Sequence, residues 1–194
     1  MEIRISKAGE DHRQEIARCI AEGFEKDFSV LCRDNERVAA AIAPGLESGK
    51  FYIAEAGGTV VGTLAVSDRH GRAARVDRGA MRKHLGLLKG IIGTLVLREE
   101  FEVPLDYPPS TGYLEFVTVR QAWRGKGVAS RLVRESMALS GYRDFVLDVT
   151  DINTAAIRCY TRLGFREFKR VPEKHPKQKG FGAKVYMRYE EEMP

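Results

Sequence analysis

The stretch FVTVRQAWRGKGVASRLVRESM, residues 116–137, passes from an apolar segment through two glycines into an amphipathic segment. The apolar part predicts a strand that ends at Val119, and the amphipathic part predicts a helix that begins near Gly127. Glycine has no Cβ, so the backbone at this turn can come close to a ligand. The first amide groups of a helix lack partners within it and lie at the positive end of its dipole. The turn therefore predicts a binding site for an anion such as phosphate or pyrophosphate.

Four explanations compete for this turn. The plainest is a helix start with a surface loop, in which Arg124 and Lys126 are only solvated. A Walker phosphate loop requires Ser or Thr after the lysine, and Gly127 stands there, so that loop is excluded. A dinucleotide-binding turn stays open, because both glycines and Ser130 come close to the GxGxxG/A pattern and Asp148 stands near the position of its acidic residue. The fourth explanation is the pyrophosphate loop of an acyl-CoA transferase.

Strands and helices alternate from Tyr113 onward. The predicted order is strand 113–119, helix 127–140, strand 144–150, helix 153–163, strand 165–171 and strand 181–189. This alternation indicates an α/β layer structure. A loop with Pro172 and Pro176 joins the last two strands and is too short for a helical crossover, so those two strands should be antiparallel.

The preceding part of the chain predicts a strand at 3–5, a helix capped by Asp11 that runs to about 24, a helix over about 35–43, and a hairpin. The hairpin has strands at 51–54 and 60–64, and Gly57 and Gly58 supply its tight turn. Residues 68–112 contain a charged loop, an apolar helical stripe over 81–97 that three glycines weaken, and three prolines. We interpret this segment as an insertion into a single domain, 1–194, because it is too short for a core of its own.

Composition restricts the class of protein. The chain of 194 residues is 43% hydrophobic and 30% charged, and no apolar stretch approaches the roughly 20 residues of a membrane span. The N-terminus lacks the apolar region of a signal peptide, and three cysteines without metal spacing fit reduced thiols in a cytoplasm. The four histidines are scattered, so we expect no metal site.

The net charge of +5 comes mainly from two clusters, at 69–83 and 169–184. These clusters are either solvated loops or a field that attracts an acidic ligand. They lack interleaved aromatic residues and any recognisable binding motif, which argues against a nucleic-acid partner. Association with a membrane is not expected either, and homodimerisation is left open.

A second informative stretch is DINTAAIRCYTRLGFREF at 151–168. Together with the glycine turn, it resembles motifs of the GCN5-related N-acetyltransferase (GNAT) family. The family signature is Arg or Gln, two residues, Gly, one residue, then Gly or Ala, and Arg124, Gly127 and Ala129 match it. In the second motif Asn153 opens a helix, Tyr160 follows seven residues later, and Leu-Gly-Phe leads into the next strand. The resemblance is strong over 113–168, fair for the hairpin at 51–66, and absent from the insertion.

The resemblance implies the acyl-CoA N-acyltransferase fold, with a mostly antiparallel central sheet, one splayed parallel pair of strands and helices on both faces. It also implies an enzyme that transfers an acetyl group from acetyl-CoA to a primary amine. The co-substrate would lie where strands 113–119 and 144–150 diverge, with the pantetheine arm along the first strand and the pyrophosphate on the turn. The implied binding residues are Val117, Thr118 and Val119 for pantetheine, and Arg124, Gly125, Lys126, Gly127, Val128, Ala129 and Ser130 for pyrophosphate, with Asn153 also in contact with CoA.

Tyr160 is the candidate general acid. The departing thiolate has a conjugate acid with a pKa of about 8.5, and a phenol with a pKa of about 10 can supply its proton. The alternative is a core tyrosine with a solvated hydroxyl, which is the usual role of a lone Tyr on an amphipathic helix. Asn153 similarly has the simpler role of a helix cap.

Glu115 is the candidate base, since an attacking ammonium, with a pKa of about 10.4, must lose a proton. Strand alternation predicts that its side chain shares a face with Val117 and Val119. Exposure at a sheet edge or pairing with an arginine also explains a charged residue in this strand. The donor to the tetrahedral oxyanion would be a strand amide near 117–119.

The acceptor depends on the variable elements, which are the first helices, the insertion and the loop at 172–180. If the stretch at 81–97 packs over the cleft, the acceptor site is enclosed and favours a small amine. Two other functions remain as alternatives, a non-catalytic acyl-CoA-binding module and a dinucleotide-binding protein.

Overall fold

A seven-stranded sheet forms the centre of the molecule in the computed structural model, which describes residues 2–190. The strands follow the spatial order β1-β2-β3-β4-β5-β7-β6, and every neighbouring pair is antiparallel except β4 and β5. The predicted fold class, a mixed sheet with one parallel pair, is therefore confirmed. The strands are β1 (Arg4–Lys7), β2 (Phe51–Ala56), β3 (Thr59–Ser67), β4 (Thr111–Val119), β5 (Asp144–Thr150), β6 (Arg166–Pro172) and β7 (Ala183–Tyr189).

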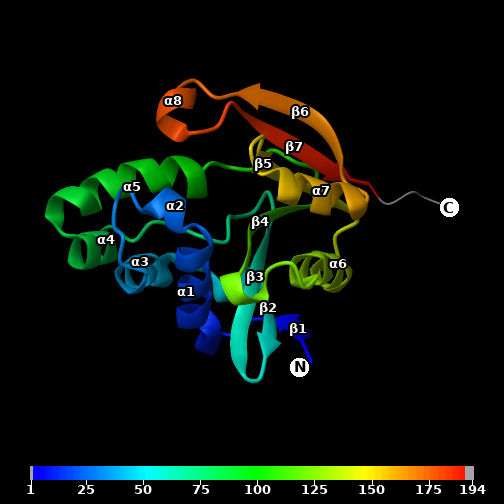
Figure 1. Ribbon diagram of the computed structural model, residues 1–194, viewed down its shortest axis with the longest axis horizontal. Coiled ribbons are helices and arrows are strands. Elements are labelled where there is room, and N and C mark those ends of the chain that lie inside the picture. Colours follow the sequence, from blue (N-terminus) through cyan, green and yellow to red (C-terminus); the bar gives the residue numbers. More distant parts are fainter. Residues whose placement is uncertain (1, 191–194) are drawn as a thin grey trace.

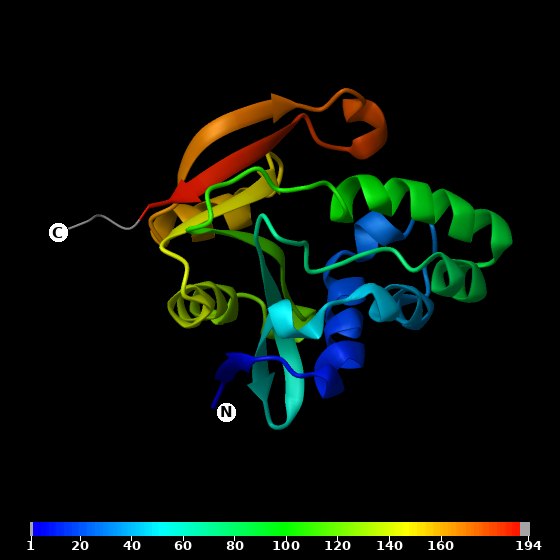
Figure 2. The same cartoon turned by 180° about the vertical axis from the view of Figure 1, so that it is seen from behind.

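Helices cover both faces of this sheet (Figures 1 and 2). They are α1 (Arg13–Gly23), α2 (Glu25–Phe28), α3 (Asn35–Ile42), α4 (Arg78–Leu85), α5 (Leu87–Phe101), α6 (Val128–Ser140), α7 (Thr154–Arg162) and α8 (Pro176–Lys179). We call the face under α1, α3, α4 and α5 the front face and the face under α6 and α7 the back face. Helix α8 lies in the loop between β6 and β7, next to the C-terminal end of α5 (Figure 1).

Each face has its own hydrophobic core. On the front, side chains of α1, α3 and α4, including Ile16, Ile20 and Met81, pack against Phe51 and Ile53 of β2. The back core combines α6 and α7 with residues of β2 to β5 and β7. Alternation along the strands separates the two sets, because successive side chains of a strand point to opposite faces.

Most predicted elements are present within a few residues of their expected bounds, including the antiparallel pair β6–β7. The hairpin β2–β3 turns at Gly57 and Gly58, both of which have positive φ. The expected cap of α1 was wrong: Asp11 lies inside a short 3-10 turn, and α1 begins at Arg13 without a side-chain cap. Asp34 caps α3 by accepting hydrogen bonds from two backbone N–H groups.

The helix predicted over 81–97 is in fact two helices, α4 and α5, which meet at Gly86 with φ of 87°. The apolar stripe expected over 81–97 is also not the buried face of α5, because its residues Leu88, Ile91, Ile92 and Leu95 are 40% to 72% exposed. Instead Gly90 and Gly93 face the interior, where an added Cβ on Gly90 would lie 2.6 Å from the Cα of Arg82. The glycines therefore allow α5 to approach α4 closely, and the large aliphatic residues are displaced outward.

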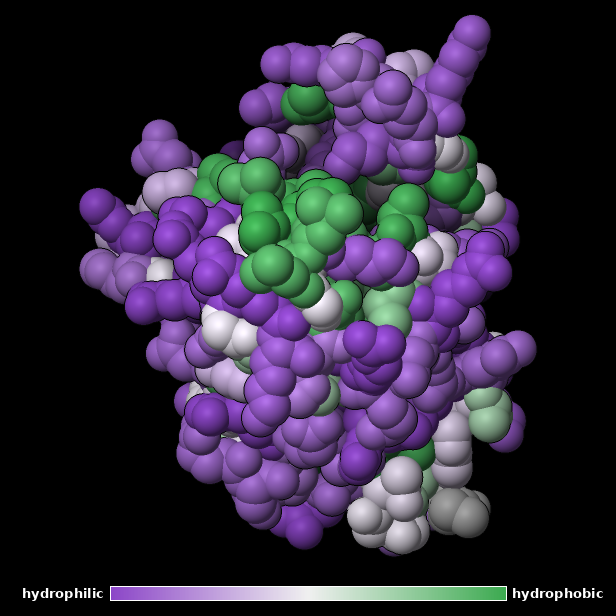
Figure 3. All heavy atoms as spheres, turned by 90° about the vertical axis from the view of Figure 1, so that its left-hand side faces the viewer, coloured by the Kyte–Doolittle hydropathy of each residue, from purple (hydrophilic) through white to green (hydrophobic). Residues whose placement is uncertain are grey.

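The outer surface of α5 is an uncovered aliphatic strip, which Figure 3 shows as an apolar area surrounded by hydrophilic residues. Its side chains are 40% to 72% exposed. They are Leu87, Leu88, Ile91, Ile92, Leu95 and Val96. None of the helices within residues 2–190 is long and apolar enough to cross a membrane.

Candidate active site

Strands β4 and β5 separate soon after they begin. Their parallel ladder has three pairs, and the last of these joins Tyr113 to Val146. Both strands continue for several residues beyond this pair, to Val119 and Thr150. A parallel ladder normally satisfies the backbone groups on the facing edges of both strands. The split therefore leaves backbone donors and acceptors of β4 available to an extended ligand.

A β-bulge in β4 accompanies the split. Phe116 has φ of 53°, the single positive φ among the non-glycine residues that the structure describes, and the register with β3 shifts at this point. The ring of Phe116 packs on the front face against Phe24, Phe51 and Phe101, with ring centroids 5.1–6.5 Å away. A left-handed conformation at such a residue costs on the order of 1–3 kcal/mol, which this aromatic packing must offset.

The bulge corrects one expectation about the strand. Glu115 points to the front face, where it contacts Ser67, whereas Val117 and Val119 pack in the back core. The prediction that Glu115 shares a face with these two valines is wrong, because the extra residue at the bulge breaks strand alternation.

The glycine turn follows the end of β4. Gly125 and Gly127 have φ of 76° and 77°, and a Cβ added at either would meet nothing within 4 Å. Backbone conformation thus explains both glycines, and the space above the turn is open. The first hydrogen bond of α6 joins the N–H of Arg131 to the carbonyl of Gly127, at 3.0 Å. The preceding amides have no acceptor within the helix and no capping side chain, which is the arrangement that binds anions.

The cations of the turn have contacts of their own. The Nε of Arg124 donates to the carbonyl of Val119 at 2.9 Å and ties the turn to the end of β4. The Nζ of Lys126 lies 5.1 Å from the ring centre of Trp123, in cation–π contact. Arg124 thus has a structural role that requires no ligand.

Tyr160 lies on α7, which Asn153 caps by accepting a hydrogen bond from the Ala156 N–H at 3.2 Å. The ring is 7% exposed and packs on Phe165 in the back core. Burial raises the pKa of Tyr160, and Cys159 and Asp148 contribute in the same direction. None of the hydrogen bonds found within residues 2–190 involves its hydroxyl, and the buried side-chain atom without a partner in that range is Oδ1 of Asn35 instead, so the hydroxyl keeps contact with solvent and can donate to a ligand.

Helices α6 and α7 are joined beside the turn. Ser130 Oγ lies 3.1 Å from Cys159 Sγ, in hydrogen-bond contact. Ser130 belongs to the first turn of α6, and Cys159 directly precedes Tyr160. This contact brings the helix that carries the phenol next to the helix start with unpaired amides.

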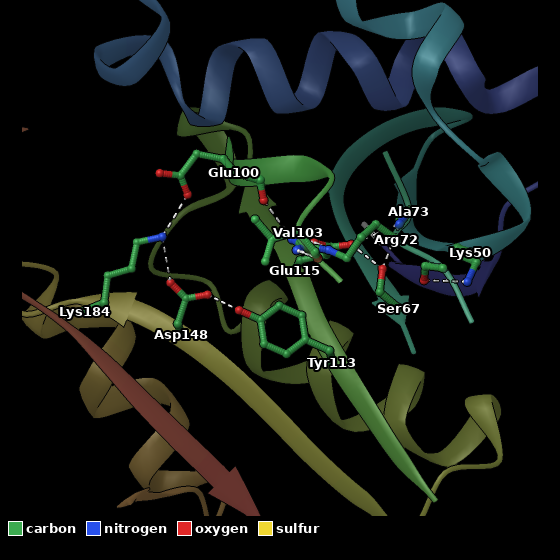
Figure 4. Close-up of polar contacts among 11 residues, drawn as sticks. Lys50, Ser67, Arg72, Ala73, Glu100, Val103, Tyr113, Glu115, Asp148 and Lys184 are labelled. Atoms are coloured by element: carbon green, nitrogen blue, oxygen red, sulfur yellow. Dashed lines mark hydrogen bonds and ion pairs between the residues drawn. The ribbon is translucent and has the colours of Figure 1, made fainter. Parts of the chain in front are cut away.

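Glu115 forms a buried ion pair with Arg72 (Figure 4). One of its oxygens accepts hydrogen bonds from the hydroxyl of Ser67 and the N–H of Ala73, and the other accepts from Arg72. Arg72 also donates to the carbonyl of Glu100, in the last turn of α5, and to that of Val103, two residues beyond the helix. The pair therefore connects β4 to α5.

A second polar group lies beside this pair on the front face (Figure 4). Asp148 of β5 accepts a hydrogen bond from the hydroxyl of Tyr113. Lys184 of β7 donates to Glu100 at 2.8 Å, and its Nζ lies 3.5 Å from Asp148. Burial raises the pKa of Tyr113, and Asp148 raises it further, so the phenol stays protonated as a donor.

The profile of the Acetyltransferase (GNAT) family matches residues 13–165, which is most of the chain. The chain belongs to the GNAT acetyltransferase family. The resemblance found in the two sequence motifs is confirmed, and so is the prediction that the protein is an N-acetyltransferase.

Individual relatives of this acetyltransferase agree with that result. It is 33% identical over 63 residues to N-alpha-acetyltransferase 30 of Schizosaccharomyces pombe, and the match covers 31% of this chain and 42% of that relative. An N-acetyltransferase from Staphylococcus aureus superposes with a TM-score of 0.66 at 15% identity, over 96% of this chain and all of the other. Two further structures superpose over all of this chain and 96% of theirs. One is the ribosomal-protein-S18-alanine N-acetyltransferase of Escherichia coli (TM-score 0.59, 14% identity). The other is yncA of Salmonella typhimurium, which was solved with its cofactor acetyl-CoA (TM-score 0.60, 16% identity).

The acetyltransferase fold brings the predicted residues around one split. The end of β4 (117–119), the turn (124–130) and α7 with Asn153 and Tyr160 are adjacent, as the contacts Arg124–Val119 and Ser130–Cys159 demonstrate. Their roles in binding and catalysis stay predictions. The dinucleotide alternative loses its basis in the fold, because such domains have mostly parallel sheets and this sheet has one parallel pair.

The group around Asp148 in this acetyltransferase is not among the site residues that the sequence motifs predict. Those motifs place Asp148 only in the dinucleotide pattern, and they do not include Tyr113, Lys184 or Glu100 as site residues. One signal was available, since Asp148 stands between Leu147 and Val149 in an apolar strand, as Glu115 stands in β4. Its partners come from β4, β7 and α5, so only the folded chain identifies them.

Proposed function

We propose that this acetyltransferase moves an acetyl group from acetyl-CoA to the primary amine of a small molecule by direct attack. The observation that carries the proposal is the continuity of the β4–β5 split with the unpaired helix start at 125–130. An extended ligand that ends in a diphosphate fits this combination. The presence of acetyl-CoA as cofactor in the Salmonella typhimurium neighbour supports the choice of co-substrate.

The chain offers suitable groups for the pantetheine arm and for the diphosphate of such a ligand. Backbone groups of Val117, Thr118 and Val119 would hydrogen-bond the pantetheine arm as a neighbouring strand would. Amides from Gly125 to Ser130 would hold the pyrophosphate, with positive charge from Lys126. The open space above both turn glycines supports this assignment, because a bulky phosphate group needs it.

Tyr160 would protonate the leaving thiolate. The amine nitrogen forms a bond to the thioester carbonyl carbon, the C–S bond breaks, and the sulfur takes the phenolic proton. An acceptor that binds as an ammonium first loses one proton to a base or to water, which frees the nitrogen lone pair for the attack. After the attack the nitrogen loses a second proton to solvent, and the tyrosinate takes up one proton from solvent, so that one proton is released overall. Burial and a free hydroxyl both support this role, because the phenol stays protonated at neutral pH and has no competing acceptor among the described residues. A strand amide near the bulge would stabilise the oxyanion.

Glu115 is a weaker candidate for the base than its position in the strand suggested. Both of its oxygens already accept hydrogen bonds, and its partner Arg72 is itself held by α5. To take a proton, Glu115 would have to lose one of these bonds. The assignment therefore stays a prediction that a variant must test.

The acceptor side of the split lies on the front face. We propose that the chain is one acetyltransferase domain and that α4, α5 and the following segment to 110 restrict access to the split from this side. The contacts of Arg72 and Lys184 with Glu100 support this, because they bind the end of α5 to β4 and β7 through the network of Figure 4. Such an enclosure suits a small amine better than a protein tail.

Calorimetry and a thiol-release assay test the proposed function. We expect the purified chain to bind acetyl-CoA and not NAD, and to release free CoA when a primary amine is supplied. A chain that binds acetyl-CoA but releases no free CoA with any of a broad set of amines would be a non-catalytic acyl-CoA-binding module. Binding of NAD in place of acetyl-CoA would restore the dinucleotide alternative.

A further inference from the structure

Lys184 lies between two carboxylates at the opening of the split. Its Nζ is 2.8 Å from Glu100 and 3.5 Å from Asp148 (Figure 4). We infer that in the free enzyme this ammonium occupies the position where the ammonium of the acceptor binds to Asp148. The inference rests on the proposed function, and it specifies the acceptor as an amine that is protonated when it binds.

The position of Asp148 is the first argument. It lies two residues beyond Val146, which makes the last ladder pair with β4, so it stands where the two strands begin to separate. Its neighbours Leu147 and Val149 pack in the back core, which leaves Asp148 on the front face. Tyr160 belongs to the back core. An amine held by Asp148 and the phenol of Tyr160 would thus approach a thioester in the split from opposite faces.

The bonding capacity of Asp148 is the second argument. One of its oxygens accepts from Tyr113, and the other faces Lys184 across 3.5 Å, which is at the outer limit of a hydrogen bond. Its side chain keeps 24% of its surface exposed. Asp148 therefore has an oxygen that a closer ammonium donor can use. Glu115 has no such capacity, since the hydrogen bonds of both its oxygens are already made inside the protein.

The chemistry of Lys184 is the third argument. Burial by itself would lower the pKa of this amine, but the charges of Asp148 and Glu100 outweigh burial and raise it. Lys184 therefore remains a cation and competes with an acceptor ammonium instead of acting as a nucleophile. Its shorter contact is with Glu100, so it can release Asp148 and still keep an anionic partner.

The resulting specificity is for alkyl ammonium groups over uncharged amines. An aliphatic primary amine is protonated at neutral pH, with a pKa of about 10.4 for the lysine side chain. Such a group replaces the Lys184 charge at Asp148 without leaving a carboxylate unpaired. An aromatic amine, which is uncharged at neutral pH, offers no such replacement.

Calorimetric binding of n-butylamine to the enzyme saturated with CoA tests this inference without requiring turnover. Replacing Lys184 by Met removes the internal competitor, and we expect the Kd for n-butylamine to fall about fivefold, the effect of losing one partly exposed ion pair. In Asp148→Asn we expect that Kd to rise at least about tenfold. Aniline should bind wild type and Lys184→Met equally.

Two control variants separate charge from structural damage. Lys184→Arg keeps the cation, so its Kd for n-butylamine should stay close to that of wild type. Asp144→Asn changes another carboxylate of β5, at the closed end of the ladder, and should have no effect. Thermal unfolding of each variant verifies that it folds, and any variant that does not fold is replaced by Lys184→Gln or Asp148→Ser.

The outcomes are distinct. The inference would be overturned if the Kd for n-butylamine did not fall in Lys184→Met. It would also be overturned if that Kd were unchanged in folded Asp148→Asn. Failure of wild type to bind acetyl-CoA would instead overturn the proposed function. The two results can also diverge. If wild type binds acetyl-CoA and releases thiol, but Lys184→Met binds n-butylamine no more tightly than wild type, the proposed function stands and the inference is refuted.

Discussion

Phe116 and Glu115 are neighbours in β4, yet both side chains point to the front face of the sheet, since the backbone at Phe116 is left-handed. This one departure from alternation turns Glu115 into the partner of Arg72 and directs Val117 into the back core. The local geometry of the split therefore depends on how firmly the Phe116 ring is held.

Replacing Phe116 by Ala tests that dependence. The ring contacts three other aromatic rings, so its loss should lower the free energy of unfolding by about 3 kcal/mol. Urea denaturation measures this change. Phe168→Ala serves as control: because Phe168 is 42% exposed, this variant should lower the free energy of unfolding clearly less. Equal losses for the two variants would contradict the importance of this aromatic packing.

Gly127 and Gly141 form a matched pair for testing the anion site. They flank α6, have φ of 77° and 79°, and neither has protein atoms within 4 Å of an added Cβ. Changing either to Ala should cost about 1–2 kcal/mol of stability through backbone strain. Gly127→Ala alone should also weaken acetyl-CoA binding at least about tenfold, because its Cβ enters the space assigned to the pyrophosphate. Calorimetry on both variants would refute the assignment if they bound acetyl-CoA equally well.

Tyr160→Phe should reduce kcat by about 10²–10³-fold while acetyl-CoA binding and stability stay nearly unchanged. The reason is that the hydroxyl has no partner in the described part of the chain, so the protein loses no hydrogen bond. Tyr189→Phe, in the same core, is the control.

The pH profile gives a second readout for Tyr160. Burial raises the pKa of Tyr160 above its ordinary value of 10.0. The phenol should therefore stay protonated, and activity that depends on it should persist up to at least that pH. A loss of activity between pH 7 and 9 that disappears in Tyr160→Phe would contradict this.

Cys19 should be inert in the folded protein. Burial raises the pKa of Cys19 to about 12. Iodoacetamide at pH 8 should accordingly modify Cys32 and Cys159, which are partly exposed, before Cys19. Mass spectrometry of peptides locates the label, and rapid labelling of Cys19 would count against its burial.

The raised pKa of Cys19 also predicts how stability changes with pH. Since the unfolded thiol ionises near 9.0 and the folded one near 12, the free energy of unfolding should fall as pH rises through that interval.

The elements whose signals are local could be predicted from the sequence. The turn at 124–129 and the motif from Asn153 to Phe165 located a strand, two helices and the phenol, because each depends on residues close together in the chain. The bulge was not predictable, since Phe116 is an ordinary strand residue whose conformation follows from three distant rings. The division of α4 from α5 was missed because glycines that weaken an isolated helix also permit close helix packing.

The polar network of the front face could not be predicted from the sequence either, because its partners lie far apart in the chain. Arg72 and Glu115 are 43 residues apart, and Lys184 and Glu100 are 84 apart. No spacing rule connects residues at such separations. Only the packing of α5 across β4 and β7 brings them together.

The aliphatic strip on α5 also has a practical consequence at the bench. Six hydrocarbon side chains in contact with water favour aggregation at high protein concentration and retention on a phenyl resin. Exchanging Leu88 and Leu95 for glutamine should yield a more soluble preparation that elutes earlier, with an unaltered melting temperature, since neither side chain belongs to the buried core.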